Sequence, residues 1–101
     1  MSIHGTLPEK FLNQIPIKDA DEAIKLLRGD PCKNTRNFLV IQNEIAWIEI
    51  EVYGREVGLH QHTNHYLIDT MLARSLVKQG VVLKKWHPVE YGGEQFELKN
   101  A

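Results

Sequence analysis

The centre of the chain reads Phe38-Leu-Val-Ile-Gln-Asn-Glu-Ile-Ala-Trp-Ile-Glu-Ile-Glu-Val-Tyr53. β-Branched and aromatic residues fill two segments, 38–41 and 45–53, and the polar residues 42–44 between them suit a short turn. The pattern therefore predicts an antiparallel hairpin. Because alternate residues of a strand point to opposite faces, the second strand divides into two sets. We expect the core-facing set to be Ala46, Ile48, Ile50 and Val52, and the solvent-facing set to be Glu49, Glu51 and Tyr53.

A helix is predicted before this hairpin, over residues 20–28. Asp19 can accept hydrogen bonds from the first turn, and Gly29 is placed to end the helix. Its inner stripe is Ala20, Ala23, Ile24 and Leu27. Further upstream, the cap-type Thr6 followed by Pro8 predicts a short helix that carries Phe11, Leu12 and Ile15.

Three more strands and a second helix are predicted after the hairpin. Alternating residues over 57–62 indicate a strand, and Thr63 or Asn64 can cap a helix that runs to about Lys78. The inner stripe of this helix is Ile68, Met71, Leu72 and Leu76. Two short strands follow, over 81–86 and 94–99. The order favours one α+β domain spanning residues 1–101, an antiparallel sheet of four to five strands with two helices packed on one face.

Composition narrows the classes of function. The chain has 101 residues and a formal net charge of -1, so it supplies no overall field to hold a nucleic acid backbone or an anionic membrane. Cys32 is the only cysteine, which excludes an intramolecular disulfide and a cysteine-rich zinc site. The sequence shows no signal peptide and no apolar run of the roughly 18 residues that span a bilayer. We therefore expect a cytoplasmic protein that does not bind membranes.

The segment after the hairpin holds three histidines at the spacing His-x-His-x-x-His. His60, His62 and His65, with Asp69 four residues later, form a candidate site for zinc or another divalent transition metal. The spacing resembles the His-x-His-x-Asp-His motif of the metallo-β-lactamase-like hydrolases. Asn64 stands at the aspartate position, however, and 101 residues are too few for that fold.

The predicted elements place the histidines apart. On a strand, His60 and His62 share the face opposite Leu59 and point to solvent. On the following helix, His65 falls on the apolar stripe and points inward. We therefore interpret His65 as a hydrogen-bonded residue at the margin of the core. A metal-binding protein or metal-dependent enzyme remains the alternative.

The segment from Tyr66 to Lys99 resembles the recognition helix and β-wing of winged-helix DNA-binding domains, over about 35 residues. That resemblance implies phosphate contacts from four basic residues, Arg74, Lys78, Lys84 and Lys85. The chain before this segment is predicted as strands where a winged helix has helices. Nucleic-acid binding is therefore an alternative to the favoured function.

The favoured function is that of a small, non-enzymatic binding or regulatory domain that acts through a protein partner or through a copy of itself. No nucleophile–base pair, phosphate-binding loop or complete metal motif is present, so no catalytic residue is assigned. Large aromatic residues dominate binding hot spots. The candidate partner-binding residues are Trp47, Tyr53, Trp86 and Tyr91. Core packing is the alternative for Trp47.

Overall fold

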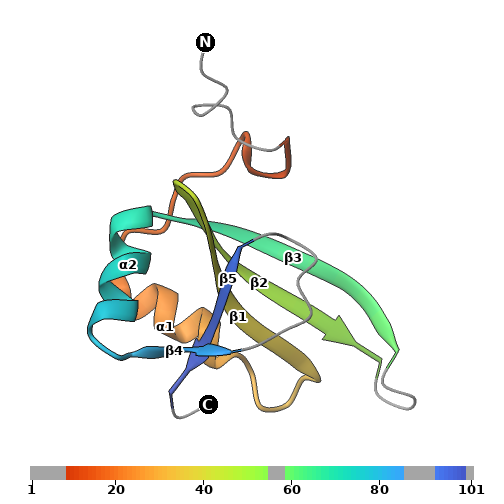
Figure 1. Ribbon diagram of the computed structural model, residues 1–101. Coiled ribbons are helices and arrows are strands. Elements are labelled where there is room, and N and C mark those ends of the chain that lie inside the picture. Colours follow the sequence, from red (N-terminus) through yellow and green to blue (C-terminus); the bar gives the residue numbers. More distant parts are fainter. Residues whose placement is uncertain (1–8, 55–58, 86–92, 100–101) are drawn as a thin grey trace.

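The computed structural model describes residues 9–54, 59–85 and 93–99. One five-stranded antiparallel sheet, with the strand order β3-β2-β1-β5-β4, carries two helices (Figure 1). The elements in chain order are the 3-10 turn η2 (Glu9–Phe11), α1 (Ala20–Arg28), β1 (Thr35–Gln42), β2 (Ile45–Tyr53), β3 (His60–Ile68), α2 (Thr70–Lys78), β4 (Val82–Lys85) and β5 (Glu94–Leu98). The predicted α+β class is confirmed.

The central hairpin forms as predicted. β1 and β2 pair from Thr35↔Val52 to Gln42↔Ile45, so β1 begins three residues earlier than expected. Asn43 in the turn has φ 57°. Asparagine adopts this left-handed conformation more readily than most residues, which suits a tight reversal between two strands.

The first helix also has its predicted bounds. The side chain of Asp19 accepts a hydrogen bond from the backbone N–H of Glu22 over 3.2 Å, and Gly29 ends α1 with φ 72°. Ala23 and Leu27 are buried against the sheet. The capping signals in the sequence therefore predicted both ends of this element.

The predicted boundary between strand and helix at residues 62–64 is wrong. β3 continues to Ile68, and α2 begins at Thr70, with Asp69 as its cap, accepting from Leu72 N over 3.1 Å. Pairing with β2 holds residues 63–68 in the extended conformation and overrides the capping propensity of Thr63. The predicted inner stripe changes accordingly. Met71 is 80% exposed, while Ala73 and Leu76 are the buried residues of α2.

The main core lies between the sheet and the two helices, as expected. Both α1 and α2 cover the same face, and their buried residues contact those of the sheet (Figure 1). The buried residues of this core are Ala23, Leu27, Leu39, Ile41, Ala46, Ile48, Ile68, Ala73, Leu76, Val82 and Phe96. β2 and β3 extend beyond α1, so the helices cover only part of the face (Figure 1).

A second, smaller core on the opposite face was not predicted. Phe11 from η2 packs with Phe38, Val40, Trp47 and Leu67. The expectation that Glu49 faces solvent is therefore wrong, because its side chain is completely buried on this face. The predicted N-terminal helix is a turn of three residues, and Leu12 and Ile15 remain exposed.

At the other end of the sheet, β4 and β5 pair antiparallel, and β5 also pairs with β1. The predicted turn over 87–93 lies, apart from Gly93, outside the described residues. The two described α-helices have nine residues each, and neither is long and apolar enough to cross a membrane.

Candidate functional site

The three histidines of the predicted metal site lie on one strand, β3, but not on one face. The register shifts between Val52 and Tyr53, so that Val52 is opposite His62 and Tyr53 is opposite His60. This bulge leaves Gln61 as the extra residue and reverses the alternation beyond it. His60 consequently stacks edge-on against Tyr53, with ring centroids 5.6 Å apart, on the face that carries the second core.

The predicted ligand set is therefore divided. His60 and His65 share the face of the second core, His62 lies on the helical face, and Asp69 caps α2. The predicted pairing of His60 with His62 on one face is wrong, because the bulge separates them. In the ranges that the structure describes, no three His, Cys, Asp or Glu residues are grouped so that they could hold a metal ion.

His65 belongs to a buried polar cluster with two residues of β2. Its Nε2 lies 3.3 Å from Oε1 of Glu49, and the indole N–H of Trp47 donates to the same oxygen over 3.0 Å. Burial lowers the pKa of His65 below 6.5, and the nearby Lys10 lowers it further, against the opposing effect of Glu49. As predicted, His65 is a hydrogen-bonded residue at the margin of a core, although a strand and not a helix carries it.

The N-terminal segment closes this cluster from outside. The ammonium group of Lys10 lies 4.9 Å from the centroid of a Trp47 ring and 5.3 Å from that of Phe11. Phe11 in turn packs edge-on against His65, at a centroid distance of 6.2 Å. Cation–π and ring contacts thus hold η2 on the sheet.

Toward the far end of β2 the same face becomes polar. The hydroxyl of Tyr53 donates to Oε1 of Glu51 over 2.9 Å, and this bond raises the pKa of the phenol above 10.0. Arg36 lies 3.8 Å from Glu51 and 3.8 Å from Glu97. Long ion pairs with a half-exposed arginine contribute little stability. Of the predicted aromatic contacts, Tyr53 is half-buried here, Trp47 is 3% exposed and belongs to the core, and Trp86 and Tyr91 lie outside the described residues.

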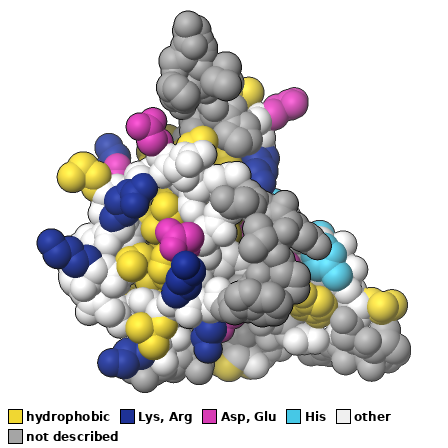
Figure 2. Space-filling model, in the orientation of Figure 1, with side chains coloured by type: hydrophobic (Ala, Val, Ile, Leu, Met, Phe, Trp, Pro, Cys, Tyr) yellow, Lys and Arg dark blue, Asp and Glu magenta, His cyan; other side chains and the backbone are white. Residues whose placement is uncertain are grey.

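The basic residues of the winged-helix interpretation are exposed but separated. Arg74 donates to the carbonyl of Asn43 over 2.8 Å, and Lys84 pairs with Glu94 at 2.9 Å. Lys78 ends α2, and Lys85 ends β4. Figure 2 shows lysine and arginine side chains spread singly over the helical side of this view, with acidic ones among them. The β4–β5 pair is built into the five-stranded sheet and is not a separate wing.

The outer edge of β3 is the most distinctive feature for binding. Gln14 pairs with this edge through its side chain: Nε2 donates to the carbonyl of His65 over 2.8 Å, and Oε1 accepts from Leu67 N over 2.7 Å. Ile17 continues the contact, with its N–H donating to Leu67 O and its carbonyl accepting from Asp69 N, both at 2.9 Å. Residues 14–17 thus act as a short substitute strand that covers the C-terminal end of β3.

Nothing in the described part of the chain pairs with the rest of that edge. β3 has β2 on one side only, and the bridge at Ile17 reaches no further back than His65. Because His65 and Leu67 direct their carbonyls outward, alternation directs the backbone groups of Thr63 outward as well. The other edge strand, β4, has only four residues and ends in two exposed lysines, which protect an edge from pairing.

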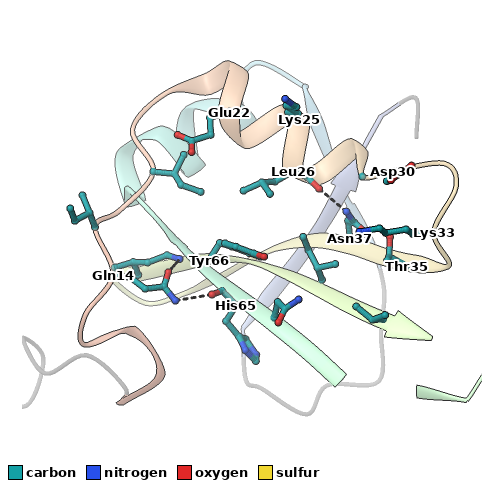
Figure 3. Close-up of a pocket in the computed structure, with 17 residues that line it drawn as sticks. Gln14, Glu22, Lys25, Leu26, Asp30, Lys33, Thr35, Asn37, His65 and Tyr66 are labelled. Atoms are coloured by element: carbon teal, nitrogen blue, oxygen red, sulfur yellow. Dashed lines mark hydrogen bonds between the residues drawn. The ribbon is translucent and has the colours of Figure 1, made fainter. Parts of the chain in front are cut away.

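A groove of about 860 Å³ lies on the helical face beside the C-terminal half of β3, where Asn64, Tyr66 and the covering residues Gln14 and Ile17 line it. Ile50, Val52 and Tyr66 contribute apolar surface from the sheet, and Lys25 and Leu26 of α1 line it from the helix (Figure 3). Figure 3 shows the side chains of His65 and Tyr66 leaving β3 in opposite directions, so the imidazole points away from the groove. The groove is separate from the Glu49 cluster.

Sequence reasoning did not identify this edge. One signal was available: residues 59–68 contain no Lys, Arg, Asp, Glu or Pro, and edge strands normally carry such residues. No local sequence pattern predicts that the side chain of Gln14 pairs with β3. Comparisons with protein-family models, curated proteins and solved structures found no match to this chain.

Proposed function

We propose that this chain is a binding domain that recruits a protein partner by adding one of the partner's extended segments to the open edge of β3. The observation that carries the proposal is the stretch of β3 before His65, with which no described residue pairs on the outer side, on a strand of nine residues without Lys, Arg, Asp or Glu. Strand addition derives its affinity from main-chain hydrogen bonds, which an open edge offers in a regular row.

The chain itself provides the precedent for this mode of binding. The segment from Gln14 to Ile17 already pairs with the last third of β3 through backbone and amide groups. A partner segment would continue the same row of hydrogen bonds toward His60. This precedent supports the geometry that we propose for the partner's strand.

The groove beside α1 supplies a place for side chains. Residues that alternate along an added strand point to the two faces of the sheet. Those on the helical face would lie beside His62 and Asn64 of β3, and long side chains could reach Ile50 and Val52 on the next strand, which are half-buried and apolar. Lys25 and Glu22 at the groove add charges of both signs. We expect apolar residues at alternate positions of the partner segment.

The test uses peptides selected from a random displayed library against the full chain. Thr63→Pro removes the outward N–H while leaving the inner ladder with β2 in place, and proline is tolerated at such edge positions. We expect it to weaken the selected peptide at least about tenfold, because the central main-chain hydrogen bond is lost. Hydrogen exchange should show new protection of the amides of Thr63 and His65 on binding.

Thr63→Val is the matched control, since it keeps the N–H and the branched shape and removes only the hydroxyl, which lies 2.7 Å from Nε2 of His60. Its affinity should equal that of the unaltered chain. A library that yields no binder to a chain shown to be monomeric contradicts the proposal. So does a binder that a folded Thr63→Pro variant, checked by circular dichroism, retains in full.

A further inference from the structure

The open edge of β3 fits a second copy of this chain. We infer that two copies pair antiparallel through β3, around a two-fold axis at Thr63, so that the two sheets join into one. This inference rests on the proposed strand addition and names its occupant. Three features of the edge support it: its charge, its length and the position of its exposed apolar residues.

The first feature is the absence of charge. A strand that pairs with its own copy brings identical segments together, so any lysine or glutamate near the axis would face a like charge. The segment from Leu59 to Ile68 has neither acidic nor basic residues apart from its histidines. Pairs across the axis would join Thr63 to the partner's Thr63 and His62 to the partner's Asn64. Threonine pairs of this kind are favourable on a sheet surface.

The second feature is the length of edge that is available. Gln14 and Ile17 occupy the edge from His65 onward, so a partner strand centred on Thr63 meets this boundary two residues from the axis, where its Gln61 is opposite His65. By the two-fold symmetry the same limit applies at the other end of the pair. The substitute strand thus acts as a stop that sets the register.

The third feature is the position of three exposed apolar side chains. Leu59, the residue before β3, is 67% exposed, and Ile15 and Leu12, one and two residues from Gln14, are 88% and 60% exposed. Leu59 lies four residues before Thr63. Leu67, whose N–H donates to the side chain of Gln14, lies four residues after Thr63. An antiparallel pair around Thr63 therefore brings Leu59 of each copy toward the partner's Ile15. The apolar ends of the edge are complementary to each other under the same two-fold axis that pairs the strands.

The experiment measures self-association of the full chain by analytical ultracentrifugation at neutral pH. The unaltered chain should sediment as a dimer. Thr63→Lys and Thr63→Glu each place like charges opposite one another at the axis and should weaken the dimer about tenfold or more. An equimolar mixture of these two variants places opposite charges together and should restore the dimer. Thr63→Val serves as the uncharged control and should dimerise like the unaltered chain.

Circular dichroism of each variant confirms that it is folded, and both charged variants retain the outward N–H. An unaltered chain that remains monomeric at high concentration overturns the inference, as does a dimer that both charged variants keep. Failure of this kind is distinguishable from failure of the proposed function. If the chain is a monomer and Thr63→Pro still weakens the selected peptide, the dimer is excluded and strand addition is retained. If the chain is a monomer and Thr63→Pro has no effect on peptide affinity, both the dimer and strand addition are overturned.

Discussion

The indole N–H of Trp47 donates to the carboxylate of Glu49, two residues further along β2, over 3.0 Å. Both side chains lie on the same face of the strand, in a core closed by Phe11. His65 approaches the same oxygen from the neighbouring strand at 3.3 Å. A fully buried carboxylate is therefore stabilised by polar contacts from two strands, and these contacts help to hold β2 and β3 together.

Replacement of Glu49 should destabilise the fold. The size of the loss should depend on whether the new side chain can accept the hydrogen bond from the indole N–H of Trp47. Glu49→Leu leaves the indole N–H of Trp47 buried without its acceptor, which costs about 1–3 kcal/mol of unfolding free energy. Glu49→Gln keeps a carbonyl oxygen at the same distance along the side chain and should lose less. Urea unfolding monitored by tryptophan fluorescence compares the two variants. Equal stability of the leucine variant and the unaltered chain would show that the carboxylate contributes nothing to folding.

Acidification should destabilise the chain through His65. Its pKa is lowered below 6.5 by burial and by Lys10, so His65 binds a proton more weakly in the folded chain than in the unfolded chain. Stability is therefore greatest above about pH 6.5 and falls as the pH decreases from there toward the lowered pKa of the folded state. Unfolding free energies measured from pH 7.5 to 5 should show this decrease. The His65→Gln variant should show a smaller decrease over the same range, and an equal one would assign the effect to other groups.

Local signals in the sequence predicted some elements and not others. α1 has its expected bounds because Asp19 and Gly29 act within one turn of the helix. The end of β3 was missed by six residues because pairing with β2, a contact between distant segments, outweighs the cap propensity of Thr63. The bulge at Gln61 and the cover provided by Phe11 are likewise tertiary features. They explain why the faces of His60 and Glu49 were assigned wrongly, and why the open edge was not recognised.

Removal of the Gln14 side chain should uncover the C-terminal end of β3. Gln14→Ala eliminates the hydrogen bonds to His65 O and Leu67 N, and should cost about 1–2 kcal/mol of stability. The amide of Leu67 should then exchange with solvent faster, while the amide of Asp69, held by the carbonyl of Ile17, changes less. Hydrogen exchange followed by nuclear magnetic resonance measures both amides. Gln14→Glu is the matched control because it retains the oxygen acceptor and loses the donor. Unchanged exchange at Leu67 in the alanine variant would contradict the role of Gln14 as a substitute strand.

Two glycines with similar φ angles should respond differently to alanine. Gly29 and Gly80 have φ values of 72° and 75°, so either substitution costs about 1 kcal/mol or more from the backbone alone. A Cβ at Gly80 would meet nothing within 4 Å, whereas one at Gly29 would lie 2.7 Å from Nδ2 of Asn37. That amide cannot move aside freely, because it donates to the carbonyl of Leu26 over 2.6 Å and ties β1 to the end of α1.

Gly29→Ala should therefore be more destabilising than Gly80→Ala, by about 1–2 kcal/mol for the displaced hydrogen bond and the crowding around it. Thermal and urea unfolding of the two variants measure the difference directly. Asn37→Ala provides the remaining control. It removes the obstructing amide, so the further loss on adding Gly29→Ala should shrink toward that of Gly80→Ala. Equal losses for the two glycine variants would show that the contact with Asn37 does not restrict this end of α1.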